Sequence, residues 1–359
     1  MNYCSGWGKC DSKNSADECR GIARIARGRL VREPCHDSVA NKDAFKAVKP
    51  NQITLFDTSK NKPLVVFENR GMIFRGSFLI LLLAGISCIG GKPITLKYLE
   101  SNSWLLTYGQ LTVAIDPVLQ GNLDFGIPLL YSGSRRYIDG EEALKTVAQT
   151  ANYILISQGL DDHAHTPTLK RLSVLQPSMT YVCPPSAVSI LKSCGVKEFN
   201  IKVISPGQKT VMTGRNVNIE VMATNGALVG PPWQAKENGY VLRAEGFPSL
   251  YYEPHCMYEE EELSPLSVDC VITPIVAQKL PGYTLVDGDS QAVRLCELLK
   301  AKYVVPMLNG ELDQTGILSQ LLLTEGSAGV KTFETLLSKS AVSTQFVPVS
   351  PGADIKIGS

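Results

Sequence analysis

The stretch YILISQGLDDHAHTP, residues 153–167, joins an apolar run to a cluster of acids and imidazoles. Tyr153–Ser157 has the β-branched and aromatic composition of a short buried strand. Thr166 followed by Pro167 is typical of a helix start, with a capping residue before a proline at the first helical position. The polar cluster between them is therefore predicted to lie on a strand-to-helix loop, where functional side chains are common.

On both sides of this loop, short β-branched runs alternate with helix-length segments. We predict strands at Ile94–Leu99, Trp104–Thr107, Leu111–Ile115, Tyr153–Ser157, Val217–Met222, Tyr240–Arg243, Leu250–Tyr252, Cys270–Thr273 and Tyr303–Pro306. We predict helices at Glu141–Thr150, Pro167–Val174, Pro185–Ser193, Ser290–Lys300 and Gly316–Leu323. The early strands follow one another closely and the later ones are separated by helices, which indicates an α/β domain with sheets covered by helices.

The loop resembles the signature of the metallo-β-lactamase superfamily, in which a buried strand ends in His-x-His-x-Asp-His and the ligands hold one or two metals. Asp162 and His163 take the last two signature positions, whereas Gln158 and Leu160 stand where the first two histidines belong. The resemblance implies an αββα sandwich, two mixed β-sheets flanked by helices, over residues 93–359. It also implies a degenerate metal motif.

Other segments are similar to the family in their place along the chain. Ala114–Pro117 resembles the early Asp-Pro turn, and Leu250–His255 takes the place of the strand that normally ends with a bridging aspartate. Residues 223–230 contain no histidine where the third one is expected, and Leu308 stands where the final strand usually delivers another. Most of the family's ligands are therefore replaced.

More narrowly, the chain resembles a plant and cyanobacterial group of this fold. The shared stretches are Asn102–Trp104, Gly121–Gly126, Asp161–His163, Gly230–Trp233 and Tyr251–His255. This narrower resemblance implies a chloroplast location.

The donors that remain can supply at most one metal site, because leucine cannot coordinate a cation and a two-metal hydrolase needs ligands for both ions. We expect Asp162, His163 and His255 to hold one zinc, iron or manganese ion, since three protein donors plus water match the usual catalytic pattern. Glu253 is expected as a further ligand or a general base. Asp162 and Glu253 are therefore the candidate catalytic residues.

Alternatives to this site stay open. Asp162 and His163 could form only a hydrogen-bonded clasp that anchors the loop. Asp116 or His165 could be recruited as ligands, although we expect His165 to be an exposed loop residue beside the helix start.

Three further features each have a functional and a structural interpretation. Cys256 neighbours His255 but is expected to be a small buried residue rather than a nucleophile, because adjacent residues on a strand point to opposite faces. Gly121–Pro128 forms either a rim over the site or a long connection. Gly230–Gln234 forms either a pocket wall or a tight turn with a packed indole.

These features predict a hydrolase-like protein of the metallo-β-lactamase fold with a substrate that the sequence does not name. The alternative is a non-catalytic binding or scaffold protein that uses the former active-site cleft for a small acidic metabolite or a protein partner. Lys plus Arg number 35 against 34 for Asp plus Glu. Without a global basic field, nucleic acid binding is disfavoured.

Residues 1–92 read as an N-terminal extension, with arginines and little hydrophobic periodicity, and we interpret them as a candidate targeting region. The uncharged segment 76–91 is shorter than the roughly 20 residues that a membrane-spanning helix needs. We therefore expect a packed segment or a leader in preference to a membrane anchor. The ten cysteines are dispersed along the chain, which favours a reducing compartment.

Overall fold

The computed structural model describes four short strands within residues 1–85 and then residues 91–228, 235–325 and 329–358. The chain divides into two compact units, residues 1–85 and 86–359. The first unit contains two antiparallel pairs, β1 (Ile25–Ala26) with β2 (Arg29–Leu30) and β3 (Gln52–Asp57) with β4 (Lys62–Phe67). Of the apolar segment 76–91, all but Gly91 lies outside the described residues. Within the described ranges, no helix has the length and apolar content needed to cross a membrane.

The second unit is built around two mixed seven-stranded sheets. Sheet I has the order β11 (Ile201–Val203), β10 (Thr180–Cys183), β9 (Tyr153–Leu155), β7 (Leu111–Ile115), β6 (Trp104–Tyr108), β5 (Ile94–Tyr98), β23 (Asp354–Ile357). Sheet II has the order β12 (Lys209–Thr213), β13 (Asn218–Asn225), β14 (Asn238–Ala244), β15 (Leu250–Tyr252), β16 (Cys270–Pro274), β19 (Tyr303–Met307), β22 (Gln345–Phe346). Two small sheets accompany them, formed by β8 (Ser132–Ser134) with β20 (Asp313–Thr315), and by β17 (Ala277–Leu280) with β18 (Tyr283–Val286) and β21 (Leu323–Glu325).

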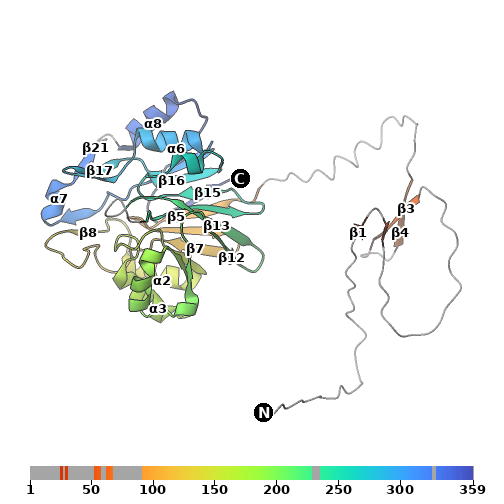
Figure 1. The fold of residues 1–359 in the computed structure, drawn as a ribbon, viewed down its shortest axis with the longest axis horizontal. Coiled ribbons are helices and arrows are strands. Elements are labelled where there is room, and N and C mark those ends of the chain that lie inside the picture. The colour runs from red at the N-terminus through yellow and green to blue at the C-terminus, as the bar shows by residue number, and fades with distance from the viewer. Residues whose placement is uncertain are drawn as a thin grey trace, which may run out of the picture. The chain divides into compact units, whose positions relative to one another are not determined.

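Helices cover the outer faces of the two large sheets (Figure 1). Sheet I carries α2 (Gly140–Thr150), α3 (Thr166–Leu175) and α4 (Val188–Ser193), the last preceded by a 3₁₀ turn, η1 (Pro185–Ala187). Sheet II carries α5 (Glu260–Leu263), α6 (Ser290–Leu298) and α8 (Gly329–Lys339). The remaining short helices are η2 (Glu198–Asn200) and α7 (Ile317–Leu321). The predicted αββα sandwich is confirmed.

The largest apolar cluster lies between the sheets. Leu106 of β6 and Val113 of β7 meet Leu242 of β14 and Ile272 of β16, and all four side chains are fully buried. Two further clusters lie beneath the helices on either side. β7 is buried on both faces, because one face meets the second sheet and the other meets helices.

Candidate metal centre

Loops from both sheets meet where parallel strands end. In sheet I, β7 and β9 run parallel, and Ile115 pairs with Leu155. Asp116 follows β7 directly, and residues 156–165 follow β9. In sheet II, β15 and β16 run parallel, and residues 253–256 follow β15. Parallel strands place their carboxyl ends at one edge of a sheet, so these loops gather polar side chains at a common edge.

Asp116 is the buried anchor of the site. Its Oδ1 accepts from the backbone N–H of Ser157 at 2.8 Å, and its Oδ2 accepts from the Ser157 hydroxyl at 2.5 Å. Tyr252, at the end of β15, donates its hydroxyl to the same Oδ2 at 2.7 Å, so a residue of sheet II contacts a residue of sheet I. Nδ1 of His163 lies 2.9 Å from this oxygen. A carboxylate that accepts from one imidazole nitrogen fixes the ring and directs the other nitrogen outward.

Two of these loops require unusual backbone conformations. Asp116 has φ 42° and Cys256 has φ 55°, both in the left-handed region that non-glycine residues rarely adopt. Each such residue costs on the order of 1 kcal/mol or more, and the surrounding contacts must offset that cost. In the loop after β9, a Cβ at Gly159 would approach backbone atoms of Ser186 to 2.6 Å, so only glycine fits there.

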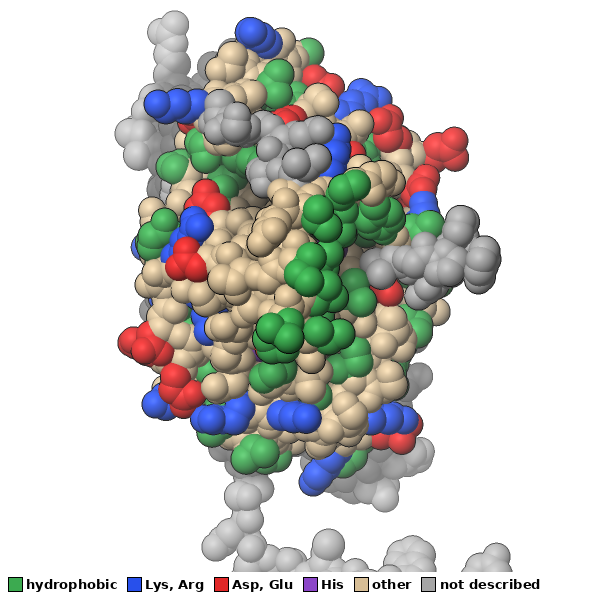
Figure 2. Space-filling view, turned by 90° about the vertical axis from the view of Figure 1, so that its left-hand side faces the viewer, with side chains coloured by type: hydrophobic (Ala, Val, Ile, Leu, Met, Phe, Trp, Pro, Cys, Tyr) green, Lys and Arg blue, Asp and Glu red, His purple; other side chains and the backbone are tan. Residues whose placement is uncertain are grey.

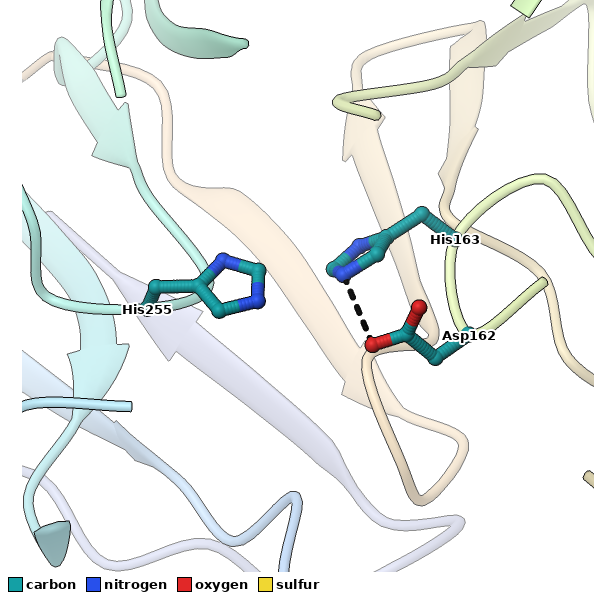
Figure 3. A group of neighbouring side chains, drawn as sticks. All are labelled: Asp162, His163 and His255. Atoms are coloured by element: carbon teal, nitrogen blue, oxygen red, sulfur yellow. Dashed lines mark ion pairs between the residues drawn. The ribbon is translucent and has the colours of Figure 1, made fainter. Parts of the chain in front are cut away.

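The predicted ligand group is assembled in the structure. Asp162, His163 and His255 each offer one ligand atom, and these atoms all lie within 4.8 Å of one another. Figure 3 shows the His255 ring pointing toward the His163–Asp162 pair from the opposite side. Nε2 of His163 lies 3.1 Å from Oδ2 of Asp162.

These residues fit a metal ion in their chemistry. Two imidazoles and one carboxylate form a donor set of the catalytic zinc type and of the non-haem iron type. Oδ1 of Asp162 is buried and has no hydrogen-bond partner among the described residues, which leaves it available to a cation. Donors about 2.1 Å from one tetrahedral ion lie roughly 3.4 Å apart, so the group must contract slightly on binding.

The charges in the group are strongly coupled. Burial alone lowers the pKa of an imidazole, but the carboxylates of Asp162 and Asp116 oppose it and raise the pKa of His163 to about 10. Burial raises the pKa of Asp162, whereas the neighbouring His163 and His255 bring that pKa below its ordinary value. Because a metal ligand must be unprotonated, an ion that binds here has to displace the proton on Nε2 of His163.

His255 is oriented by two buried residues. The side-chain amide of Gln158 lies 2.8 Å from Nδ1 of His255, and Oε1 of Glu253 lies 3.8 Å from the same atom. The other oxygen of Glu253 accepts from the backbone N–H groups of His255 and Met257, at 3.1 and 2.7 Å. These contacts leave Nε2 of His255 free to face the ligand group.

A pocket of about 390 Å³ opens above these residues. Asp162 and His255 lie in its lining together with Asn102 and Asn309, which follow other strands of the two sheets. Residues 123–125 also line it, so the loop Gly121–Pro128 forms part of a rim. Gly230–Trp233 lies outside the described residues.

The expectation that His165 is exposed is wrong. Its side chain is fully buried, and the residue caps α3, one position before the predicted cap at Thr166. Nδ1 of His165 lies 2.8 Å from the hydroxyl of Thr168, which also accepts from the backbone N–H groups of Leu119 and Gln120. The hydroxyl proton is therefore available to His165. Thr168 ties the start of α3 to the loop after β7, and the His165 ring contacts the same hydroxyl.

Three other residues singled out in the sequence analysis lie near the ligand group but are not part of it. Cys256 is buried, as predicted, but it lies in a turn beyond the end of β15 and not on the strand. Asp116 contacts His163 on the side away from the group, as a supporting carboxylate. Leu308 packs against the core between the sheets.

Sequence reasoning missed residues that support the ligands. Asn102 donates to the backbone carbonyl of Asp162 at 3.0 Å, and its amide nitrogen lies 3.3 Å from Nε2 of His163. The only signal was its place in a stretch shared with the plant and cyanobacterial group. Tyr252 was assigned to a strand, and nothing in the sequence predicts that its hydroxyl reaches Asp116.

Comparisons with known proteins agree with this architecture. A family model described as "Beta-lactamase superfamily domain" matches residues 95–308, and the chain belongs to that family. A comparison with curated proteins gives no match.

Among solved structures, an isothiocyanate hydrolase from Delia radicum gut bacteria has a TM-score of 0.53 at 13% identity. That match covers 74% of this chain and 100% of the other. CmlA, a diiron β-hydroxylase from Streptomyces venezuelae, has a TM-score of 0.51 at 13% identity, over 75% of this chain and 54% of that one. At these identities the similarity shows only a shared fold. Of the two proteins that share it here, one is a hydrolase and the other an oxidoreductase.

Proposed function

We propose that this protein is a metal-dependent hydrolase with a single metal site. The observation that carries the proposal is the convergence of Asp162, His163 and His255 at the base of a pocket, within reach of one ion. Gln158 and Leu160, at the positions of the first two signature histidines, limit the site to one ion. Zinc, iron and manganese all suit two imidazoles and a carboxylate.

Each residue has a distinct role in this proposal. Asp162, His163 and His255 hold the ion, which when bound would polarise a substrate carbonyl and lower the pKa of a coordinated water. Asp116 fixes the His163 ring through Nδ1, and Glu253 fixes the turn that presents His255. The Asp162 carboxylate has two oxygens, so one can hold the ion while the other receives a proton from the nucleophilic water. Glu253 acts as a positioning residue in this scheme.

Metal content tests the proposal directly. The full chain, purified without chelator, should contain about one zinc, iron or manganese ion by mass spectrometry. Asp162→Ala and His255→Ala should lose the ion, because two protein donors rarely suffice for a catalytic site. His165→Asn is the matched control, since it changes an equally buried histidine outside the ligand group and keeps an acceptor for Thr168. Two ions per chain, or none, would contradict a single-metal site.

A second candidate function is a metal-independent binding protein, and one observation favours it. With a pKa of about 10, His163 carries a proton on each ring nitrogen at neutral pH and forms ion pairs with Asp116 and Asp162. Both ring nitrogens of His163 then have a carboxylate partner, so this pairing needs no cation. Under this reading, ligand binding survives removal of metal by a chelator, and Asp162→Ala reduces stability while leaving ligand affinity unchanged.

For its location we propose the chloroplast, on the basis of the resemblance to the plant and cyanobacterial group. A fluorescent fusion of the full chain should colocalise with chlorophyll in leaf cells, and a fusion that lacks residues 1–92 should not. Equal distribution of both fusions would refute the proposal. The near balance of 35 basic and 34 acidic residues favours a small-molecule ligand over nucleic acid.

A further inference from the structure

The walls of the pocket are apolar. Leu123 and Leu130 come from the loop that precedes β8, Leu280 and Leu285 from β17 and β18, and Leu318 from α7. These side chains come from segments far apart in the sequence, so the fold assembles one continuous apolar wall. A cavity of about 390 Å³ is within the range that binds small organic ligands.

Polar groups are confined to a few places in the lining. Asn102, Asp162 and His255 lie at the base, with Gln278 and Asn309 beside them. The other polar groups of the lining are Ser101, Asp124 and the hydroxyls of Tyr131 and Tyr283. The described lining contains no lysine and no arginine. An anionic ligand would therefore face the Asp124 and Asp162 carboxylates with no lysine or arginine in the lining to pair with it, which burial in a low-dielectric pocket makes costly.

Leu160 connects the pocket to the altered signature. It takes the position of the second signature histidine, and its side chain lines the pocket. The change therefore adds apolar wall at a point where the family signature has a metal donor. Leu160 therefore differs from the signature histidine in two ways at once, because it cannot bind a metal and it adds apolar surface to the pocket.

Exposed apolar side chains adjoin the lining residues Phe125, Leu130, Leu318 and Leu322 along the chain, and we take them as the mouth of the pocket. Leu129 is 86% exposed, Ile317 62% and Ile127 56%, and Phe125 and Leu321 are nearly half exposed. Figure 2, which views the side that carries β8 and α7, shows hydrophobic side chains gathered in a connected band. Exposed apolar patches mark interaction sites, and ligand-binding grooves are among them.

We propose that the pocket binds an uncharged amphipathic molecule, with its apolar chain along the leucine wall and its polar group at Asp162 and His255. This inference rests on the proposed function only in taking the pocket as the substrate site. The chain extends from the base to the mouth, where the exposed band contacts its end. The ligand class is therefore a neutral long-chain ester, thioester or amide and not a phosphorylated metabolite.

The test uses non-hydrolysable probes on the full chain. The probes are 1-O-alkylglycerols with 4, 8 and 12 carbons in the alkyl chain, titrated by calorimetry below their micelle-forming concentrations. Affinity should rise about tenfold or more for each four-carbon step, because each buried methylene contributes favourably. Dodecyl phosphate, with the same chain and a charged head, should bind at least tenfold more weakly than the 12-carbon ether.

Two wall variants and one control locate the binding. Leu160→Asn and Leu130→Asn should each weaken the 12-carbon probe about fivefold or more, and Leu130 is exposed enough that its substitution should not affect folding. Leu175→Asn, at an exposed leucine of α3 outside the pocket, should leave affinity unchanged. Affinity that is independent of chain length, equal for the phosphate, or insensitive to both wall variants would overturn the proposal.

Metal analysis of the same samples separates the two proposals. One bound ion together with chain-length-independent affinity would overturn the ligand class and leave the metal site standing. Chain-length-dependent affinity without a bound ion would support the proposed ligand class. It would also contradict the proposal of a metal-dependent hydrolase and favour a binding protein.

Discussion

Gln158 lies fully buried at the base of the site, with its amide against Nδ1 of His255. An amide can donate to that nitrogen through its NH₂ group or accept from it through its oxygen, depending on which way it is turned. The structure has the amide nitrogen against Nδ1, at 2.8 Å. With the amide turned over, its oxygen accepts from Nδ1–H, and Nε2 of His255 keeps its lone pair for a metal. Gln158 therefore sets the tautomer of a ligand while contributing no ligand itself.

Gln158→Met should weaken metal binding about 10- to 100-fold, the usual effect of removing a partner that orients a metal-ligating histidine. The methionine fills a similar volume and cannot hydrogen-bond to the ring in the same way. Competition of the full chain with a chromophoric chelator measures the change. Gln176→Met, at the end of α3, is the control and should leave affinity unchanged. Equal affinity of wild type and Gln158→Met would show that His255 needs no orienting partner.

At the scale of elements, the strand ends opposite the site are tied together by Asp269. This residue precedes β16 and accepts from the backbone N–H and hydroxyl of Ser249, before β15, both at 2.8 Å. It also forms an ion pair with Lys302, before β19, at 2.7 Å. One carboxylate thus links the starts of three neighbouring parallel strands.

Asp269→Asn should reduce stability in a pH-dependent way. Burial alone raises the pKa of Asp269. The hydrogen bonds and charge of Lys302 and the hydrogen bonds of Ser249 outweigh this effect, so the pKa of Asp269 in the folded protein lies below its ordinary value. A lowered folded-state pKa contributes stability that is complete above the unfolded pKa of about 4 and is lost as pH falls through the folded value. Urea unfolding should therefore show the largest difference between wild type and variant near neutral pH, and a smaller one below pH about 4.

Asp354→Asn provides the comparison, since Asp354 forms an exposed ion pair with Lys97 on sheet I. Exposed pairs contribute little, so this variant should differ only slightly from wild type at every pH. A constant difference for Asp269→Asn across the pH range would mean that its ionisation is not linked to folding.

The elements of the second unit were largely predictable from sequence. Each predicted strand and helix is present, with ends that differ by a few residues. In the two large sheets, the strands β10, β11, β12, β22 and β23 were missed. Four of them are edge strands, and an edge strand such as Lys209–Thr213 is half exposed and lacks a clear apolar run. β10 is an interior strand, but it has only four residues. α8 was missed although Phe333 and Leu337, four residues apart, form its buried stripe.

The candidate site was predictable only in part. Asp162, His163 and His255 were predicted as a group, and the structure brings them together. Hydrogen bonds between the loops were not predictable, because they depend on how the two sheets pack and not on local sequence. The burial of His165 belongs to the same class: its partner, Thr168, also binds a loop from a different strand.

At the scale of the whole molecule, stability depends on the contact between the two sheets. Leu106, in the middle of β6, is fully buried in the cluster that joins them. Substitution of such a leucine by alanine removes apolar burial and leaves a cavity between two packed layers.

Leu106→Ala should therefore lower the free energy of unfolding by about 2 to 5 kcal/mol, measured by urea denaturation. Leu129→Ala is the matched control, because Leu129 is 86% exposed and its loss should change stability by less than about 0.5 kcal/mol. Similar effects of the two substitutions would argue against a tightly packed interface between the sheets.

The ligand group has a consequence for the thermal behaviour of the molecule. Asp162 and His163 follow a strand of sheet I, and His255 follows a strand of sheet II, so an ion held by all three would bridge the two halves of the sandwich. An ion that binds only the folded chain stabilises it by about 2.7 kcal/mol at a free concentration one hundred times its Kd. The melting temperature would then report the free metal concentration around the protein, rising with supply and falling under chelation, before any substrate is known.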